Sequence, residues 1–169
     1  MISADFCRTM ARYGTWQNDS LLAAADTLDD AARRADMGAF WGSIEGTLAH
    51  LLWGDRMWMA RFDGWDLPAE RLADSARAAG GWTALKAARA EADARILDWA
   101  GQLADADLAH DLTWHSAVLG RQVHRPKWLL VQHFFNHQTH HRGQVHAMLT
   151  AAGAPPVADT DLFLMPESP

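Results

Sequence analysis

Four long stretches of the chain carry apolar residues at helical spacing. They run from about residue 4 to 28, 41 to 62, 81 to 103 and 126 to 152. Apolar positions three or four residues apart fall on one face of a helix, so each stretch predicts a helix with one buried face. Turn signals follow the second stretch at Asp63-Gly64 and Leu67-Pro68, and Gly153 ends the fourth. We therefore expect an all-α fold built as a four-helix bundle.

The ends of these stretches carry their own signals. Ser43 can cap the second helix, and Pro126 suits the first turn of the fourth. Between residues 107 and 125 the pattern changes, because Leu112, Trp114 and Val118 suit strands and Gly120 suits a turn. This predicts an irregular segment or short hairpin inside a long crossover connection before the last helix. With 169 residues, we expect one domain spanning residues 1–169.

Composition and charge exclude several classes of protein. The formal net charge is −6, and no Lys/Arg cluster forms the basic face that nucleic-acid binding needs. No basic segment followed by an apolar run begins the chain, and no apolar run approaches membrane-spanning length, so we expect a cytoplasmic protein without a membrane partner. The single cysteine, Cys7, excludes an intramolecular disulfide and a cysteine-based zinc site, and we expect it to be a small buried hydrophobe.

Histidines gather in the fourth stretch. Five of the nine lie between residues 126 and 148, at positions His133, His137, His140, His141 and His146. On a helix, His133, His137 and His141 stack on one face and His140 lies beside them. His146 points elsewhere. Neutral imidazole is the commonest protein ligand for zinc and nickel, and an i, i+4 pair can reach one ion. The pattern predicts a metal site on this helix.

A histidine on the second helix can complete such a site. We expect His50, His137 and His141 to hold the ion together, because metal sites in bundles use side chains of facing helices. Three neutral imidazoles leave at least one coordination position of the ion open, as in catalytic metal sites. In such sites the metal lowers the pKa of a bound water or thiol, or polarises a carbonyl. A lone histidine among leucines is, however, usually a hydrogen-bonded core residue. Spacing also allows two other pairs, His133 with His137 and His140 with Gln144.

The remaining polar residues receive simpler interpretations. Five polar residues are candidates for contacting the metal ligands or lining a pocket: His133, His140, Asn136, Gln138 and Gln144. Arg142 can orient an anionic substrate, but we expect it to be an exposed arginine in a surface ion pair. The i, i+4 pair Arg89 and Asp93 predicts a solvated helix face. We expect surface positions for His110, His115 and His124, and we expect the apolar tail cluster Leu162, Phe163 and Leu164 to pack on the bundle.

Competing catalytic motifs are absent from the sequence. A ferritin-like di-iron centre needs Glu-x-x-His pairs, yet Glu45, Glu70 and Glu91 have no histidine three residues later. No HExxH motif is present, and neither is a GxGxxG motif or a P-loop. These absences exclude the usual zinc-protease and nucleotide-binding signatures.

Three motifs make the chain resemble the DinB/YfiT-like family of small metal-binding four-helix bundles. They are YGTWQNDSLL at residues 13–22, SIEGTLAHLLWGDRMWMARF at 43–62 and NHQTHHRGQVHAML at 136–149. Members of that family bind a divalent ion, commonly zinc or nickel, through one histidine of the second helix and an i, i+4 pair of the last. The resemblance therefore implies that the ligands are His50, His137 and His141.

The resemblance also implies an activity. Relatives include thiol-dependent S-transferases and isomerases, in which the metal activates a low-molecular-weight thiol, and relatives commonly form homodimers. We therefore expect a metal-dependent thiol transferase or hydrolase that acts on a small-molecule substrate as a homodimer. The alternative is a non-catalytic stress-response bundle with a structural ion. A third interpretation is a metal-independent bundle whose histidines line an apolar pocket.

Overall fold

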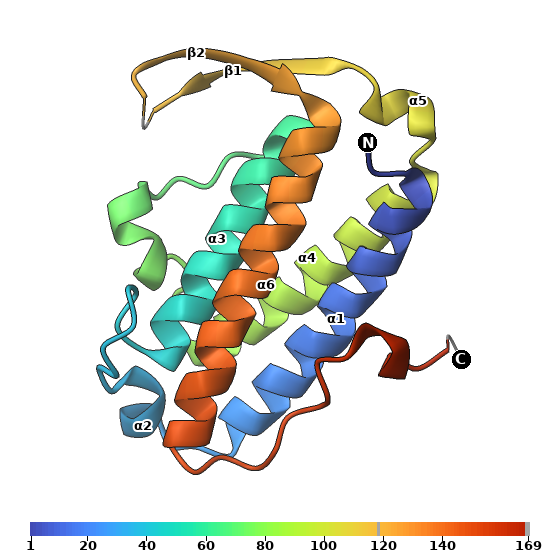
Figure 1. Cartoon of the computed structure of the whole chain (residues 1–169). Coiled ribbons are helices and arrows are strands. Elements are labelled where there is room, and N and C mark those ends of the chain that lie inside the picture. The colour runs from blue at the N-terminus through green and yellow to red at the C-terminus, as the bar shows by residue number, and fades with distance from the viewer. Residues whose placement is uncertain (118, 168–169) are drawn as a thin grey trace.

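The computed structural model describes residues 1–117 and 119–167 (Figure 1). The structure is mostly helical, which confirms the predicted helical class, and it contains one two-stranded sheet. In chain order, the elements are α1 (Ala4–Asp26), α2 (Asp30–Arg34), α3 (Ile44–Phe62), η1 (Leu72–Arg77), α4 (Trp82–Gln102), α5 (Asp105–Leu108), β1 (Asp111–Ser116), β2 (Arg121–Pro126), α6 (Lys127–Ala151) and η2 (Leu162–Leu164).

Local signals in the sequence set the ends of the long helices. The side chain of Ser43 caps α3, as predicted, by accepting a 3.0 Å hydrogen bond from the Gly46 backbone N–H. Helix α6 begins directly after Pro126, where the missing N–H of proline costs no helical hydrogen bond. It ends before Gly153, whose φ of +71° is accessible to glycine without the steric cost of a side chain.

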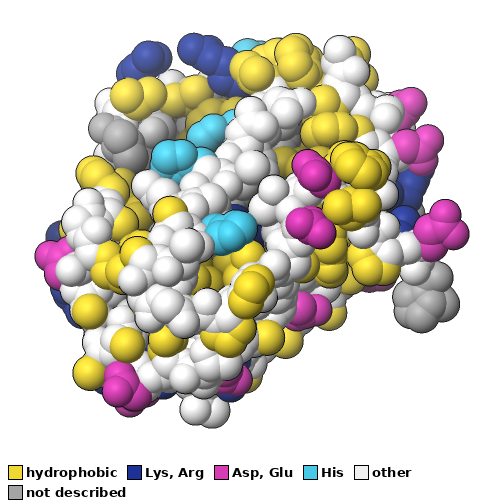
Figure 2. All heavy atoms as spheres, turned by 60° about the horizontal axis from the view of Figure 1, so that its bottom comes forward, with side chains coloured by type: hydrophobic (Ala, Val, Ile, Leu, Met, Phe, Trp, Pro, Cys, Tyr) yellow, Lys and Arg dark blue, Asp and Glu magenta, His cyan; other side chains and the backbone are white. Residues whose placement is uncertain are grey.

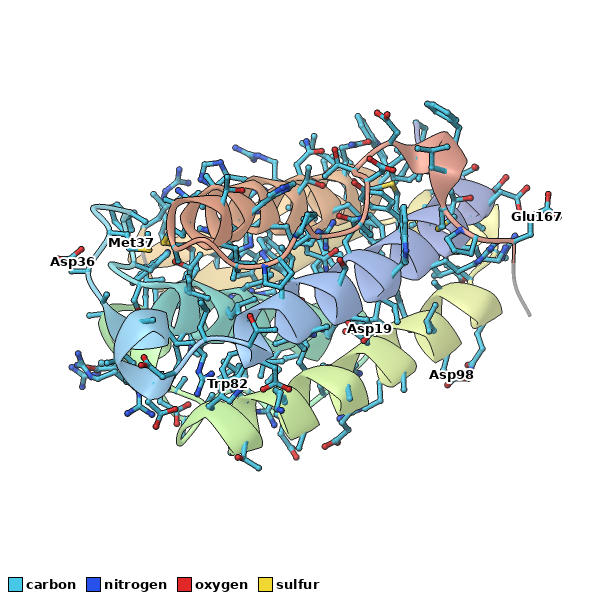
Figure 3. All side chains as sticks on the ribbon, turned by 90° about the horizontal axis from the view of Figure 1, so that it is seen from below. Asp19, Asp36, Met37, Trp82, Asp98 and Glu167 are labelled. Carbon is cyan, nitrogen blue, oxygen red and sulfur yellow. The ribbon has the colours of Figure 1, made fainter. Side chains whose placement is uncertain are left out.

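The four long helices pack side by side in a closed ring of neighbours. Helix α1 contacts α4 and α6, and α3 contacts the same two helices from the other side. Figure 1 shows α6 lying along α3, and Figure 3 shows Trp82 of α4 close to the end of α1. There the Trp82 indole N–H donates a 2.7 Å hydrogen bond to Asp26. Apolar side chains such as Leu48, Leu85 and Phe134 fill the space between the helices.

The connection from α4 to α6 contains the predicted hairpin. Strands β1 and β2 pair antiparallel, with Thr113 opposite His124, and Gly120 in the turn has a φ of +63°. The hairpin lies across the end of the molecule where α6 begins (Figure 1). Val118, which we expected to suit a strand, lies outside the described residues. His110, His115 and His124 are exposed, as predicted.

A buried polar network crosses the core, and it corrects the expectation that Arg89 and Asp93 form a solvated face. The side chain of Arg89 is 2 % exposed and pairs with Asp55 of α3 at 2.5 Å and with Asp93 at 2.8 Å. Asn18 of α1 donates a 3.0 Å hydrogen bond to Asp93, and Gln138 of α6 donates a 3.1 Å bond to Asp55. An i, i+4 ion pair has the same sequence pattern on a solvated helix face and in a buried core. Only the contacts with other helices distinguish a buried pair from a solvated one.

The expectation for the tail is wrong, and the expectation for the single cysteine is confirmed. The tail cluster in η2 does not pack on the helices, because Phe163 is 82 % exposed and its two leucine neighbours remain partly exposed. The tail contacts α1 through hydrogen bonds instead, and Val157 of the segment before η2 is among the apolar residues packed against the core. Cys7 is fully buried in α1, as predicted. Among the described residues, no helix combines the length and apolarity needed to cross a bilayer.

Candidate metal centre

Three histidines from two helices converge on one point between α3 and α6. The Nε2 atom of His137 lies 3.4 Å from Nε2 of His50 and 3.1 Å from Nε2 of His141. One ligand atom from each residue lies within 4.8 Å of the others, and the described residues contribute no carboxylate or thiol to this cluster. The structure therefore brings together the three side chains that the resemblance singled out.

The packing of α3 against α6 sets this geometry. His50 and Gly54 are four residues apart on α3, so both face α6. A β-carbon built on Gly54 would lie only 2.8 Å from Cε1 of His137. Glycine at this position therefore provides the space that the His137 ring occupies.

A serine of η1 orients the His50 ring. The Ser75 hydroxyl donates a 2.7 Å hydrogen bond to the Leu72 carbonyl, and its oxygen lies 2.8 Å from Nδ1 of His50. Because the serine proton is already used, the oxygen accepts a proton from Nδ1 of His50. The lone pair of His50 is then on Nε2, the atom that faces His137 and His141.

A glutamine orients the second ring in the same way. Oε1 of Gln144 lies 2.8 Å from Nδ1 of His141. An amide oxygen only accepts, so Nδ1 of His141 carries the proton and its Nε2 carries the lone pair. Partners on the remote ring nitrogen are the usual way in which proteins orient histidines that bind metals. Gln144 thus contacts a ring of the cluster, one of the roles considered for it from sequence.

The donor set fits a divalent ion of the zinc type. Two nitrogens bound at about 2.05 Å to one tetrahedral zinc lie about 3.3 Å apart, close to the 3.1 and 3.4 Å separations here. Two of the three Nε2 atoms carry lone pairs, and a single N–H on His137 would satisfy only one of them. A cation at the centre would satisfy all three nitrogens.

Burial keeps the imidazoles neutral. Desolvation, together with the neighbouring His141, lowers the pKa of His50 to about 4. Desolvation, with the adjacent histidines, lowers the pKa of His137 to about 3. The pKa of His141 is also lowered by burial, against the opposing effect of its hydrogen bond to Gln144. Near neutral pH the three rings are therefore neutral, as metal ligands must be.

Aromatic side chains cover one side of the cluster. The Trp41 ring stacks on His50 with centroids 3.9 Å apart, and Trp53 lies on α3 with its ring 5.9 Å from His50. Phe40, which is 82 % exposed, packs edge-on against Trp41. The loop that carries Trp41 is closed by a 2.8 Å hydrogen bond from the Met37 N–H to the Gly42 carbonyl. This arrangement restricts the access of water to His50.

The other histidines of α6 lie outside the three-histidine cluster. His133 is exposed and packs against Trp58, with its ring 5.9 Å from His137. His140 is exposed, with its ring 4.9 Å from His141. Figure 2 shows histidine side chains at the surface among mostly neutral and apolar atoms.

Arg142 corrects a further expectation. We expected an exposed arginine in a surface ion pair, but the residue is only 5 % exposed. It follows His141 on α6 and so points toward a different neighbour, α1, where its guanidinium lies 5.5 Å from the Tyr13 ring centroid. A lone arginine on a helix rich in polar residues has no local signal that reveals burial against another helix.

Sequence reasoning missed Gly54, Ser75 and Trp41. Gly54 is recognisable only as the residue one turn after His50, and Ser75 lies in a 3-10 helix without a distinctive pattern. The sequence pattern predicts a second helix that starts at about Trp41, whereas α3 begins at Ile44 and leaves Trp41 free to fold back over His50.

Comparisons with known proteins agree with this architecture. The model of the DinB family matches residues 1–168. A crystal structure of a DinB-like protein from Bacillus cereus ATCC 10987 is similar to this chain, with a TM-score of 0.50 and 19 % identity, over 85 % of this chain and 92 % of the other. No curated protein matches the chain. The family match spans all but the last residue, and the chain belongs to the DinB family.

Proposed function

We propose that this chain is a metal-dependent enzyme with a four-helix bundle fold, in which His50, His137 and His141 hold a divalent zinc or nickel ion. The convergence of three Nε2 atoms, two of them oriented through Nδ1, carries the proposal. In this architecture the segment from α4 to α6 is the long crossover connection, and it leaves α3 and α6 in direct contact.

The donor set favours a catalytic ion over a structural one. Structural zinc sites use four protein ligands, whereas catalytic sites use three and keep a position open. The cluster here contains three histidines, and within the described residues no cysteine or carboxylate joins it. When bound, the ion would lower the pKa of an approaching thiol or water molecule, or polarise a carbonyl group.

The surrounding residues support thiol chemistry. His133 is exposed but packs on one side against Trp58, and this partial desolvation lowers its pKa. Its imidazole is therefore neutral near pH 7 and can accept a proton. It lies next to His137, at the edge of the cluster. Trp41 and Trp53 flank His50 and provide apolar surface for an electrophilic substrate. We therefore propose transfer of a low-molecular-weight thiol to an electrophile, with hydrolysis as the related alternative.

A turnover assay tests this proposal. Zinc- and nickel-loaded protein is incubated with a panel of low-molecular-weight thiols and a chromogenic electrophile, and product formation is compared with that of chelator-treated protein. We expect turnover that requires the ion and that is lost in His137→Ala. The matched control, His124→Ala on the exposed hairpin, should keep the wild-type rate. Equal rates with and without metal would contradict an enzymatic role for the site.

The second candidate is a stress-response bundle whose ion is structural. The position of the cluster favours it, since the ligands join two helices that the ion would hold together. In that case removal of the metal should lower Tm strongly, while no thiol or electrophile turns over.

We also propose that the chain forms a homodimer. Members of the family commonly form homodimers, and a second copy would cover exposed apolar side chains such as Phe40 and Phe163, each 82 % exposed. Light scattering coupled to size-exclusion chromatography tests this, and a monomer mass over the working concentration range would contradict it.

A further inference from the structure

A cavity lies on the other side of α6, away from the three histidines. It is a cleft of about 210 Å³ between α1 and α6, closed on one side by the C-terminal tail. A protein cavity of about 150 Å³ can hold a molecule of the size of benzene, so this cleft has room for a small organic molecule. Its lining includes Tyr13 and Gln17 of α1, Thr139 and Arg142 of α6, and Thr160 of the tail.

The tail is attached over this cleft by specific hydrogen bonds. The Tyr13 hydroxyl donates to the Thr160 carbonyl at 2.7 Å, and Nε2 of Gln17 donates to the Asp159 carbonyl at 2.8 Å. One turn further along α1, the hydroxyl oxygen of Ser20 accepts a 2.6 Å bond from the Ala158 N–H. The cleft is thus bounded by two helices and an anchored strap of chain.

The guanidinium of Arg142 has almost no partner of its own. Among the described residues it makes one long hydrogen bond, from Nη2 to the Thr139 hydroxyl at 3.5 Å, and its buried Nη1 has no acceptor. The two buried carboxylates of the core, Asp55 and Asp93, are both paired with Arg89. Nη1 lies deep beside Gly14, whose β-carbon position is 3.5 Å away, so the cleft is served by Nη2 on the Thr139 side. Buried arginines are normally paired, and a guanidinium with one long hydrogen bond beside a cleft indicates a binding site for an anion.

The rest of the lining limits what the anion can be. Arg142 contributes one permanent positive charge. The uncharged polar groups are an aromatic face, an amide, hydroxyl groups and an imidazole, from Tyr13, Gln17, Thr139, Thr160 and His146. Leu21 adds apolar surface at one end. One permanent cation within a partly apolar lining suits a single negative charge on an uncharged body, and a carboxylate is a natural partner of a guanidinium.

We propose that the cleft between α1, α6 and the C-terminal tail is a binding site for a small monocarboxylate, held by the guanidinium of Arg142. This site is separate from the metal centre, because Arg142 faces Tyr13 of α1 while the neighbouring His141 faces His50 of α3. It does not depend on the function proposed for the three histidines.

Thermal unfolding of the full chain tests the site, with sodium propionate as the probe. Sodium chloride at equal ionic strength controls for salt, and propionamide controls for shape without charge. Chelator is present throughout, and His50→Ala is measured in parallel, so that propionate bound to a metal ion cannot produce the signal. We expect propionate at about ten times its Kd to raise Tm by about 3 °C, in wild type and in His50→Ala alike.

Two variants locate the response in the cleft. Arg142→Met keeps the length of the side chain but removes its charge, and the Tm shift should vanish. Gly143→Met keeps Arg142 and fills the cleft, because Gly143 lines it and a β-carbon there would meet no atom within 4 Å. Methionine and alanine both favour helix over glycine, so Gly143→Met should fold without a response and Gly143→Ala should fold and respond.

The outcomes separate clearly. A shift that survives in Arg142→Met or Gly143→Met, or the absence of any shift in wild type, would overturn the proposal. A larger shift with inorganic phosphate than with propionate would overturn the carboxylate assignment. Arg121→Met, which removes an exposed arginine of the hairpin, should leave the propionate response unchanged. Loss of the response in that variant would indicate general ionic effects and would also overturn the site.

Discussion

Gly54 of α3 and His137 of α6 are in such close contact that a β-carbon on the glycine would lie 2.8 Å from Cε1 of the histidine. The glycine belongs to the same face of α3 as His50, one turn away. A residue that no chemical motif identifies thus determines how closely two helices carrying the metal-binding candidates can approach.

Gly54→Ala should therefore damage the metal centre more than the fold. The added methyl group displaces the His137 ring, and we expect zinc affinity to fall at least roughly 10-fold, a loss of the size seen when the residues supporting a metal ligand are changed. Competition with a chromogenic chelator measures this affinity. Unchanged affinity would show that the ring has room to move without leaving the site.

The matched control is Gly101→Ala. This glycine also lies within a helix, α4, but a β-carbon there would meet no atom within 4 Å. Because Gly101 is one residue before the end of α4, we expect a gain of helix propensity below about 1 kcal/mol, without any change in zinc affinity.

Ser75→Ala should weaken metal binding by removing the acceptor for Nδ1–H of His50. Loss of such a partner typically lowers the metal affinity roughly 10- to 100-fold. Isothermal titration with zinc measures it. Ser116→Ala on the hairpin, far along the chain from η1, serves as the control and should bind zinc like wild type. If both variants bind equally well, Ser75 does not orient His50.

Acidification should destabilise the metal-free protein. The pKa values of His50, about 4, and of His137, about 3, lie below the ordinary value of 6.5. The unfolded chain therefore takes up protons first as pH falls, so stability present above pH 6.5 is lost progressively as pH falls toward these folded-state values. Near pH 5 the loss should be on the order of 2 kcal/mol per histidine.

Urea unfolding at several pH values in the presence of chelator measures this loss. His50→Gln should make the dependence shallower, because one of the titrating groups is absent. A free energy of unfolding that stays constant or increases as pH falls from neutral toward the folded-state pKa values would contradict the assignment of neutral, buried rings.

Arg89→Met should be strongly destabilising. It leaves Asp55 and Asp93 buried without their cation, and breaking a buried pair in this way costs about 3–5 kcal/mol. The comparison is Arg77→Met, which removes a surface pair with Asp74 from a side chain that is 79 % exposed, and which should cost less than about 1 kcal/mol. Similar urea midpoints for the two variants would contradict the role of the network.

Cys7 should be chemically inert in the native protein. Burial raises the pKa of its thiol to about 11, which leaves little thiolate. At about pH 8 we expect a chromogenic disulfide reagent to react roughly 100-fold more slowly with the native protein than with the urea-unfolded chain. Comparable rates in the two states would show that α1 opens readily.

The features predictable from sequence were those with local signals. Ser43 and Pro126 marked the helix starts, and Gly120 marked the turn of the hairpin, because capping, proline geometry and positive φ act over a few residues. The histidine stripe followed from helical periodicity. Choosing among the possible histidine pairs required the resemblance, since His133, His137 and His141 are equivalent by spacing alone.

What escaped prediction depends on contacts between distant segments. Ser75 reaches His50 across 25 residues of sequence, and Arg89 and Asp93 differ from a surface pair only through Asp55 and Asn18 on other helices. Arg142 was misplaced for the same reason. Such pairings depend on how the helices are oriented about their axes, which no local pattern records.

Metal content tests the central claim most directly. Wild type, His137→Ala/His141→Ala and the neighbouring control His133→Ala/His140→Ala are stripped with chelator, reloaded with zinc, desalted and assayed for bound metal. We predict about one ion per chain in wild type and in the control, and almost none in His137→Ala/His141→Ala. Equal metal content in that variant and wild type would contradict the account.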